Sequence, residues 1–297
     1  MNVLVTGATG AIGRLVVPKL LGAGHTVTAA GRSPGRLSAL RDAGATPLQL
    51  DLFDADAAAR AMRGHQAVVN LATKVPLGFK TFMPGAWRET SRIRRHASRA
   101  LIDAALASGV ERFVQESFAQ TYPDRGDQWV DESTPIEPAR YARAVAAAEA
   151  SAERFTRNGA IGIALRFGFL YGPGDPFTQQ LLDTVKGGWF PIFGSPDSYV
   201  SWVTHEDAAS AVVAALQASA GSYNVVDDVP LTHREAGAVI AQVAGCPPPK
   251  FLPAWTAKLA GSLGATLARS VRISNAKLRA TGWTPRYPSL ADGLRAV

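Results

Sequence analysis

The sequence predicts a doubly wound α/β fold, in which a parallel sheet carries helices on both faces and a smaller lobe follows. Three observations lead to this prediction. Short apolar runs alternate with Ala-rich helical stretches up to Arg166, a glycine-rich loop follows the first run, and glycine, proline and aromatic residues accumulate after Arg166. Strands that alternate with helices indicate right-handed βαβ units and a parallel sheet.

The first half supplies the elements of this sheet in order. Strands are expected at 2–6, 26–30, 46–50, 67–71, 111–116 and 160–166. Helices are expected between them, near 11–24, 35–43, 55–63, 88–108 and 138–157. Buried parallel strands appear in a sequence as continuous apolar runs, which these segments are. Residues 1–166 are therefore predicted to form one domain.

Residues 167–297 are predicted to form mainly a smaller, less regular lobe over the strand ends. Prolines at 247–249 and 253 interrupt this part before an Ala/Leu-rich helix. A helix after 203–207 and a strand near 222–226 repeat the pattern of the first half. The segment from about 200 to 228 is therefore expected to return to the first domain.

Composition excludes several classes of protein. The 297 residues are 47% hydrophobic and 19% charged, which is ordinary for a soluble globular protein. The single cysteine, Cys246, rules out a disulfide within the chain, and the five scattered histidines give no metal-ligand spacing. No secretory signal or apolar span of ~18 residues is evident, so a cytoplasmic protein without a membrane partner is expected. The arginine-rich stretch 88–99 is interpreted as a solvated helix face, because no nucleic-acid-binding signature accompanies it.

The strongest motif lies between Val3 and Gly13, where three glycines at three-residue spacing follow a predicted strand and open a helix. Such glycines permit a tight turn and let the backbone approach a pyrophosphate at the helix N-terminus. The sequence therefore predicts a Rossmann-type, dinucleotide-binding domain. The candidate cofactor contacts in this loop are Gly7, Thr9, Gly10, Ala11, Ile12 and Gly13.

The end of the second predicted strand indicates which dinucleotide binds. An NAD site would place an acidic residue there for the ribose hydroxyls, whereas this chain has Arg32 followed by Ser33. Arg32, with Ser33 or Arg36, can pair with a 2′-phosphate, so NADP(H) is predicted over NAD(H). Further cofactor candidates are Asp51 and Leu52 at the adenine, Leu71, Ala72 and Thr73 toward the nicotinamide ribose, and Phe167.

Four other stretches, 165–175, 202–207, 223–228 and 275–283, accompany the glycine motif. Together they resemble, nearly end to end, the extended short-chain dehydrogenase/reductases of the NAD-dependent epimerase/dehydratase type. The resemblance implies a nicotinamide cofactor and a small-molecule substrate. It also allows a homodimer formed through the helices near 88–108 and 138–157.

The chain departs from that family at the catalytic residues. The family's Tyr-x-x-x-Lys is represented by Tyr141 and Val145, and the missing lysine would hold the nicotinamide ribose and lower the pKa of the tyrosine. Tyr141 is still a candidate catalytic residue and cofactor contact, with an expected pKa of ~10. Phe118 stands where the family has its catalytic serine or threonine, so Ser117 is the candidate replacement, although neighbouring strand residues face opposite ways. Lys74 is a third catalytic candidate.

The substrate is expected to be largely apolar. Family members that act on nucleotide sugars carry asparagine where this chain has Phe169, and arginine near Val200. Gln120, Phe169 and Trp202 are the substrate-binding candidates, and the segment 74–87 is a candidate lid.

The predicted function is that of an NADP(H)-dependent oxidoreductase acting on a small, largely apolar carbonyl or hydroxyl compound, such as a secondary metabolite. Two alternatives stay open. One is an epimerase, dehydratase or cyclase that does not consume its cofactor, and the other is a non-catalytic NADP(H)-binding sensor.

Overall fold

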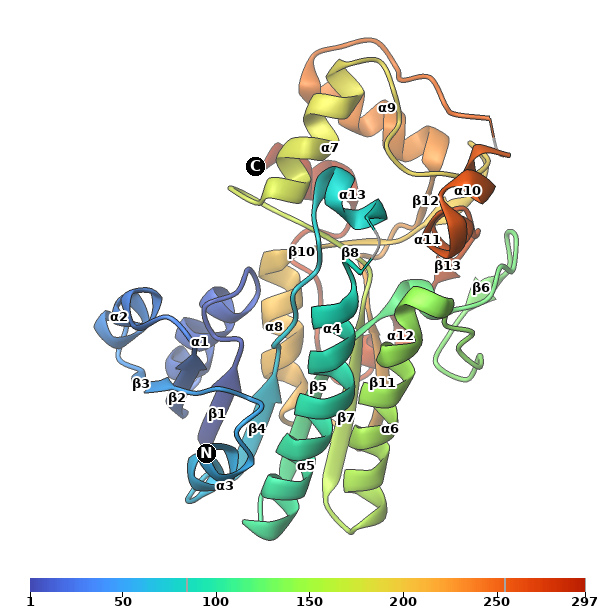
Figure 1. The fold of residues 1–297 in the computed structure, drawn as a ribbon. Helices are drawn as coiled ribbons and strands as arrows, with labels where there is room; N and C mark the ends of the chain where they lie inside the picture. Colours follow the sequence, from blue (N-terminus) through green and yellow to red (C-terminus); the bar gives the residue numbers. More distant parts are fainter. Residues whose placement is uncertain (84, 254, 297) are drawn as a thin grey trace.

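The computed structural model describes residues 1–83, 85–253 and 255–296, so residue 84 of the candidate lid lies outside the described part. Its centre is a sheet in the order β11-β7-β5-β4-β1-β2-β3, with every neighbouring pair parallel (Figure 1). The predicted doubly wound α/β fold is thus confirmed. The strands are β1 (Asn2–Thr6), β2 (Thr26–Gly31), β3 (Thr46–Gln49), β4 (Ala67–Asn70), β5 (Arg112–Phe118), β7 (Ile161–Phe167) and β11 (Gly221–Val225).

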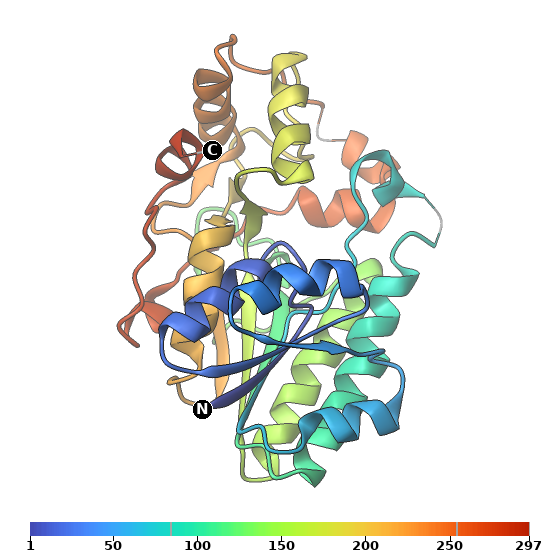
Figure 2. The same ribbon diagram turned by 90° about the vertical axis from the view of Figure 1, so that its left-hand side faces the viewer.

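Helices cover both faces of this sheet (Figures 1 and 2). Along β1, Val3 and Val5 pack into one apolar cluster while Leu4 packs into the other, as the two-residue period of a strand requires. The first cluster is covered by α1 (Gly13–Gly22), α2 (Pro34–Asp42) and α8 (His205–Ala215). The second is covered by α3 (Ala55–Met62), α5 (Ser98–Ala107) and α6 (Arg143–Arg157).

The strand order reverses at β1, because β2 lies on one side of it and β4 on the other. In open parallel sheets, ligands bind outside the carboxyl ends of the strands at such a reversal. The loop that joins β1 to α1 lies at this point of the sheet edge. The fold therefore places the predicted glycine loop at the expected position of a ligand.

The helix expected near 88–108 is interrupted. It consists of α4 (Arg88–Arg92), a π-helical turn η2 (Ile93–Ala97) and α5, with Arg94 buried in the middle. Turns of this kind are frequent at functional sites. The helix expected near 138–157 begins later, as α6, after the short turn η4 (Arg140–Ala142). Helices α5 and α6 pack together, and a homodimer formed through them stays a prediction.

The second lobe lies above the carboxyl edge of the sheet (Figure 1). Its helices are α7 (Pro176–Lys186), α9 (His233–Ala244), α10 (Thr256–Leu259), α11 (Gly261–Leu267) and α13 (Leu290–Arg295). Its strands pair as β8 (Phe169–Tyr171) with β10 (Trp202–Thr204), and β9 (Tyr199–Val200) with β12 (Leu231–Thr232). Of the intervening chain, α8 packs on α1 and β11 extends the main sheet. The short elements are η1 (Gly78–Phe82), η3 (Ala119–Thr121), β6 (Trp129–Val130), β13 (Arg272–Ile273) and α12 (Ala276–Arg279).

In the described ranges, every helix is too short or too polar to cross a lipid bilayer.

His233 makes the second lobe sensitive to acid. Its side chain is fully buried beside Phe190, neither ring nitrogen has a hydrogen-bond partner among the described residues, and burial lowers its pKa to about 4. The unfolded chain therefore binds a proton near pH 6.5, before the folded chain does, and stability falls as the pH drops from 6.5 toward 4. Below pH 6.5 the slope approaches about 1.4 kcal/mol per pH unit.

We expect His233→Phe to remove this contribution. Urea unfolding at pH 7 and at pH 5 gives the free energy of unfolding of each protein. The fall in this free energy between pH 7 and pH 5 should be smaller for the variant than for the wild type. The matched control is His96→Gln, at an exposed histidine. Equal pH dependence in His233→Phe and wild type would contradict the assignment.

Candidate active site

A cavity of about 810 Å³ lies between the carboxyl edge of the sheet and the second lobe. Its wall is built from the glycine loop, the ends of β2, β5 and β7, the segments that follow β3 and β4, parts of α4 and η2, Tyr141 of η4 and parts of the second lobe. The sequence-predicted residues that line it are Gly7, Thr9, Gly10, Ala11, Ile12, Gly13, Arg32, Arg36, Asp51, Leu52, Leu71, Ala72, Thr73, Lys74, Ser117, Tyr141, Phe167 and Phe169.

The glycine loop forms a cradle that side chains would fill. Gly7 has a φ of +69°, and a Cβ there would lie 2.7 Å from the Ala72 nitrogen. A Cβ on Gly13 would lie 2.2 Å from the Gly7 carbonyl oxygen. Helix α1 then begins without a side-chain cap and without an acidic residue in its first turn. The positive end of the helix dipole suits an anionic group, so these residues fit a pyrophosphate.

Two arginines line the cavity beyond the end of β2. The Arg32 Nη1 atom lies 3.6 Å from Glu89 Oε1 of α4, and the Arg32 side chain is 69% exposed. Arg36 lies one helical turn further, on α2. Ser33 is exposed and lies outside the cavity wall, because the chain turns outward there to begin α2. A contact of Ser33 with a 2′-phosphate stays a prediction.

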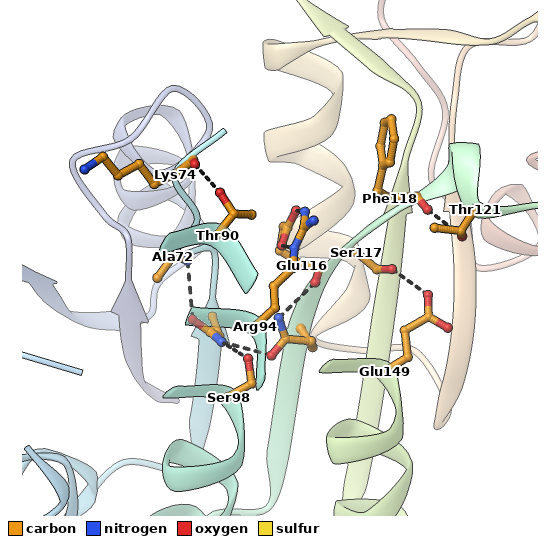
Figure 3. A network of polar contacts seen from close by, with 12 residues as sticks. Ala72, Lys74, Thr90, Arg94, Ser98, Glu116, Ser117, Phe118, Thr121 and Glu149 are labelled. Carbon is orange, nitrogen blue, oxygen red and sulfur yellow. Dashed lines mark hydrogen bonds and ion pairs between the residues drawn. The ribbon is translucent and has the colours of Figure 1, made fainter. Parts of the chain in front are cut away.

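A buried polar network supports the cradle from below (Figure 3). The Thr6 hydroxyl donates to Asn70 Oδ1 at 2.6 Å, and Asn70 Nδ2 donates to Gln115 Oε1 at 2.9 Å and to Ser98 Oγ at 3.3 Å. Asn70 Oδ1 also accepts from the Ala72 nitrogen at 3.3 Å. The network thus joins three strands and α5, and it fixes the Ala72 backbone that faces Gly7.

Tyr141 lines the cavity from the short turn η4. Its ring packs on Trp87 at a centroid distance of 4.8 Å, and its buried hydroxyl has no hydrogen-bond partner among the described residues. Burial raises the pKa of Tyr141 to about 12, against the lowering effects of the nearby Thr266 side chain and of the positive Arg94 and Arg269. This pKa is higher than the sequence led us to expect, because the phenolate would be desolvated. At neutral pH Tyr141 is therefore a hydrogen-bond donor and not a base.

Ser117 lines the cavity, but its hydroxyl is held elsewhere. It donates to Glu149 Oε1 of α6 at 2.5 Å, and Glu149 is paired with Arg166 of β7, with Nη2–Oε2 at 2.8 Å. Figure 3 shows the Ser117 side chain pointing toward Glu149 and away from Glu116. Alternation along β5 explains this direction, and the structure gives Ser117 a partner in α6 instead of a free hydroxyl.

The substrate-binding candidates separate into two groups. Phe169 lines the cavity and meets the ring of Phe118 edge to face at 6.0 Å. Trp202 is fully buried behind Phe169, and Gln120 is 2% exposed in η3; neither lines the cavity. Direct substrate contact by Trp202 or Gln120 was therefore a wrong expectation, since the apolar core of the second lobe and the end of β5 enclose them.

Lys74 lines the cavity through the segment after β4, and its side chain is exposed. Its carbonyl oxygen accepts a hydrogen bond from Thr90. Its ammonium group points away from Arg94, Glu116 and Ser117 (Figure 3).

The cavity also contains a buried ion pair that the sequence did not indicate. Arg94 of η2 donates to Glu116 of β5 through Nη2 at 2.5 Å and through Nε at 3.3 Å. The two side chains are 7% and 9% exposed, and both residues line the cavity. The arginine-rich stretch was interpreted as solvated, and that is wrong for Arg94. Within the described ranges, no group of three or more His, Cys, Asp or Glu side chains is placed to hold a metal ion.

Known proteins resemble this chain over its whole length. It is 32% identical to a 3-diazoavenalumate denitrifying reductase of a Streptomyces species, over 99% of both chains. It is 27% identical to a 2-alkyl-3-oxoalkanoate reductase of Shewanella oneidensis, over 92% of this chain and 73% of that protein. A human epimerase family protein solved with NADPH shares the fold, with a TM-score of 0.83, 22% identity and coverage of 99% and 98%.

A model of the NAD-dependent epimerase/dehydratase family matches residues 3–226, which include the glycine loop, Tyr141 and β11. The fold, the cradle at the start of α1 and the related reductases agree with this match. The chain belongs to the NAD-dependent epimerase/dehydratase family, and it is an oxidoreductase of the extended short-chain dehydrogenase/reductase type.

Proposed function

We propose that the protein is an NADPH-dependent reductase of a small, largely apolar compound. The observation that carries this proposal is a single cavity, whose wall includes the glycine cradle and Arg32 together with Phe118, Tyr141 and Phe169. NADPH, when bound, supplies a hydride from its nicotinamide ring. The protein's part is to hold the reacting groups together, exclude water and provide a proton where one is needed.

Two guanidinium groups support the choice of NADPH over NADH. Arg32 and Arg36 both line the cavity beyond β2, and guanidinium groups pair well with phosphate. In the structure Arg32 lies beside the carboxylate of Glu89 of α4, with 3.6 Å between Arg32 Nη1 and Glu89 Oε1. A 2′-phosphate would take the place of Glu89 as the partner of Arg32.

The protonation of the site favours reduction over alcohol oxidation. Oxidation of an alcohol needs a base, but burial keeps Tyr141 protonated and Glu149 already accepts the Ser117 hydrogen bond. Val145 is fully buried one turn after Tyr141 and supplies no charge. A protonated phenol can instead donate to a carbonyl oxygen as hydride adds to the carbon. A ketone with an apolar substituent is thus one class of acceptor.

A diazo compound is the second candidate acceptor, because the Streptomyces relative is named for the denitrifying reduction of one. When an arenediazonium ion accepts a hydride at carbon, a C–H bond forms, the C–N bond breaks and N2 leaves. No oxygen has to be protonated, so the reaction needs neither a tyrosine nor a lysine. The rings of Phe118 and Phe169 provide an apolar wall for an aromatic acceptor.

Calorimetric titration with NADPH and with NADH tests the first part of the proposal. We expect clear binding of NADPH and weaker binding of NADH. NADPH consumption with aryl ketones and with carboxylated arenediazonium salts tests the second part, with enzyme-free reactions as controls and products identified by mass spectrometry. Binding without net NADPH oxidation would favour the redox-neutral or sensor alternatives, and failure to bind either nucleotide would overturn the proposal.

Tyr141→Phe distinguishes the two acceptor classes. The variant keeps the ring that packs on Trp87 but lacks the hydroxyl. We expect kcat/KM for a ketone to fall by on the order of a hundredfold or more, because general acid catalysis is lost. Reduction of a diazonium salt should change little. The matched control is Tyr199→Phe, at a tyrosine outside the cavity wall, and full ketone activity in Tyr141→Phe would exclude Tyr141 as the proton donor.

A further inference from the structure

The cavity contains one buried, permanently charged cation among the described residues of its wall. Arg32, Arg36 and Lys74 are all exposed, whereas Arg94 is buried. Helix α6 supplies no cation there, since Val145 follows Tyr141 by one turn. Among the described residues that line the cavity, Arg94 is thus the buried cation.

The geometry of η2 aims Arg94 into this region. The π-helical turn lies between α4 and α5 and packs against α6, the helix that follows Tyr141. A wider turn rotates the residues within it relative to a regular helix, and here Arg94 turns inward while its neighbour Arg95 stays exposed. The charge of Arg94 is close enough to act on the Tyr141 hydroxyl.

Glu116 fixes the guanidinium but leaves part of it free. Nε and Nη2 of Arg94 donate to the two carboxylate oxygens of Glu116, and Nη1 forms no hydrogen bond with the described residues. An apolar pair of similar volume would serve the fold equally well, because desolvation offsets much of the attraction in a buried ion pair. A buried guanidinium on a cavity wall that keeps an unused donor is placed to bind an acceptor atom of a ligand.

We propose that Arg94, oriented by Glu116, is a positioning residue that holds the nicotinamide half of the dinucleotide. This inference rests on the proposed function. If the 2′-phosphate of a dinucleotide meets Arg32 and its pyrophosphate meets the glycine cradle, its nicotinamide half is left to the rest of the cavity wall, which includes Arg94. The ribose hydroxyl and carboxamide oxygens of its nicotinamide half are acceptors that suit Nη1.

The test compares two ligands by calorimetry: NADPH, and adenosine 2′,5′-bisphosphate, which lacks the nicotinamide half. The main variant is the double substitution Arg94→Met with Glu116→Met, because removing Arg94 alone would leave a buried carboxylate without a partner. We expect this variant to bind NADPH on the order of tenfold more weakly and adenosine 2′,5′-bisphosphate as the wild type does. The matched control is Arg95→Met, which should bind both ligands normally.

Arg94→Lys provides a second test that keeps the charge opposite Glu116. Lysine lacks the fork that allows one nitrogen to bind Glu116 while another donates elsewhere, so NADPH affinity should again fall selectively. Unchanged NADPH binding in both variants would overturn this inference but not the proposed function. An equal loss of affinity for both ligands would also overturn it, because such a loss indicates a general effect on the fold. A wild type that does not bind NADPH would overturn the proposed function as well.

Discussion

Gly13→Ala is expected to abolish detectable dinucleotide binding. A Cβ at this position would lie 2.2 Å from the Gly7 carbonyl oxygen and 2.7 Å from the Ala8 Cα, both backbone atoms that cannot rotate away. The loop must therefore move, and the N–H groups at the start of α1 lose their common direction. Loss of two charge-assisted hydrogen bonds alone would weaken binding by on the order of a hundredfold or more. Calorimetric titration with NADPH measures the effect.

The matched control for this prediction is Gly22→Ala, at the other end of the same helix. A Cβ on Gly22 meets no atom within 4 Å. This variant should bind NADPH like the wild type, and thermal unfolding should show that both variants are folded. Wild-type affinity in Gly13→Ala would mean that the glycine loop does not contact the cofactor.

Arg32→Ala is expected to weaken NADPH binding about tenfold or more, while NADH binding stays unchanged, because only NADPH carries the 2′-phosphate. Calorimetric titration of the variant with each nucleotide separates the two effects. Arg41→Ala, at an exposed arginine near the end of α2, is the matched control and should leave both affinities unchanged. Equal losses of affinity for NADPH and NADH would exclude Arg32 as the residue that binds the 2′-phosphate.

Glu89→Gln tests the same contact from the other side. The Glu89 carboxylate lies 3.6 Å from Arg32, where it would compete with a phosphate for the guanidinium and repel it. Removal of that charge should strengthen NADPH binding a few-fold, more at low than at high salt. An unchanged or weakened affinity would show that Glu89 does not compete at this position.

The elements of the first half follow from local sequence pattern. Each of the six predicted strands is present, with ends displaced by two residues or fewer. Parallel strands buried on both faces require continuous apolar runs, so the apolar pattern of the sequence predicts their positions directly. The glycine cradle was equally predictable, because the backbone contacts of Gly7 and Gly13 exclude any side chain.

The catalytic end of the cavity was less predictable. The sequence identified the absence of a lysine at Val145 and the ambiguity of Ser117, but not the direction of the Ser117 hydroxyl. Its partner Glu149 lies 32 residues away, on a helix whose position depends on packing against β5 and β7. Trp202 and Gln120 could not be separated from Phe169 for a similar reason, since aromatic and polar residues occur both on a cavity wall and behind it.

The sequence by itself thus determined the sheet, the glycine cradle, the arginine at the end of β2 and the loss of the usual lysine. The tertiary structure alone decided that Arg94 turns inward to meet Glu116, 22 residues further along the chain. Helical periodicity places residues on the face of a regular helix, and η2 departs from that period. A buried ion pair forms only where two separate elements pack at the right distance, and that distance is a property of the folded chain.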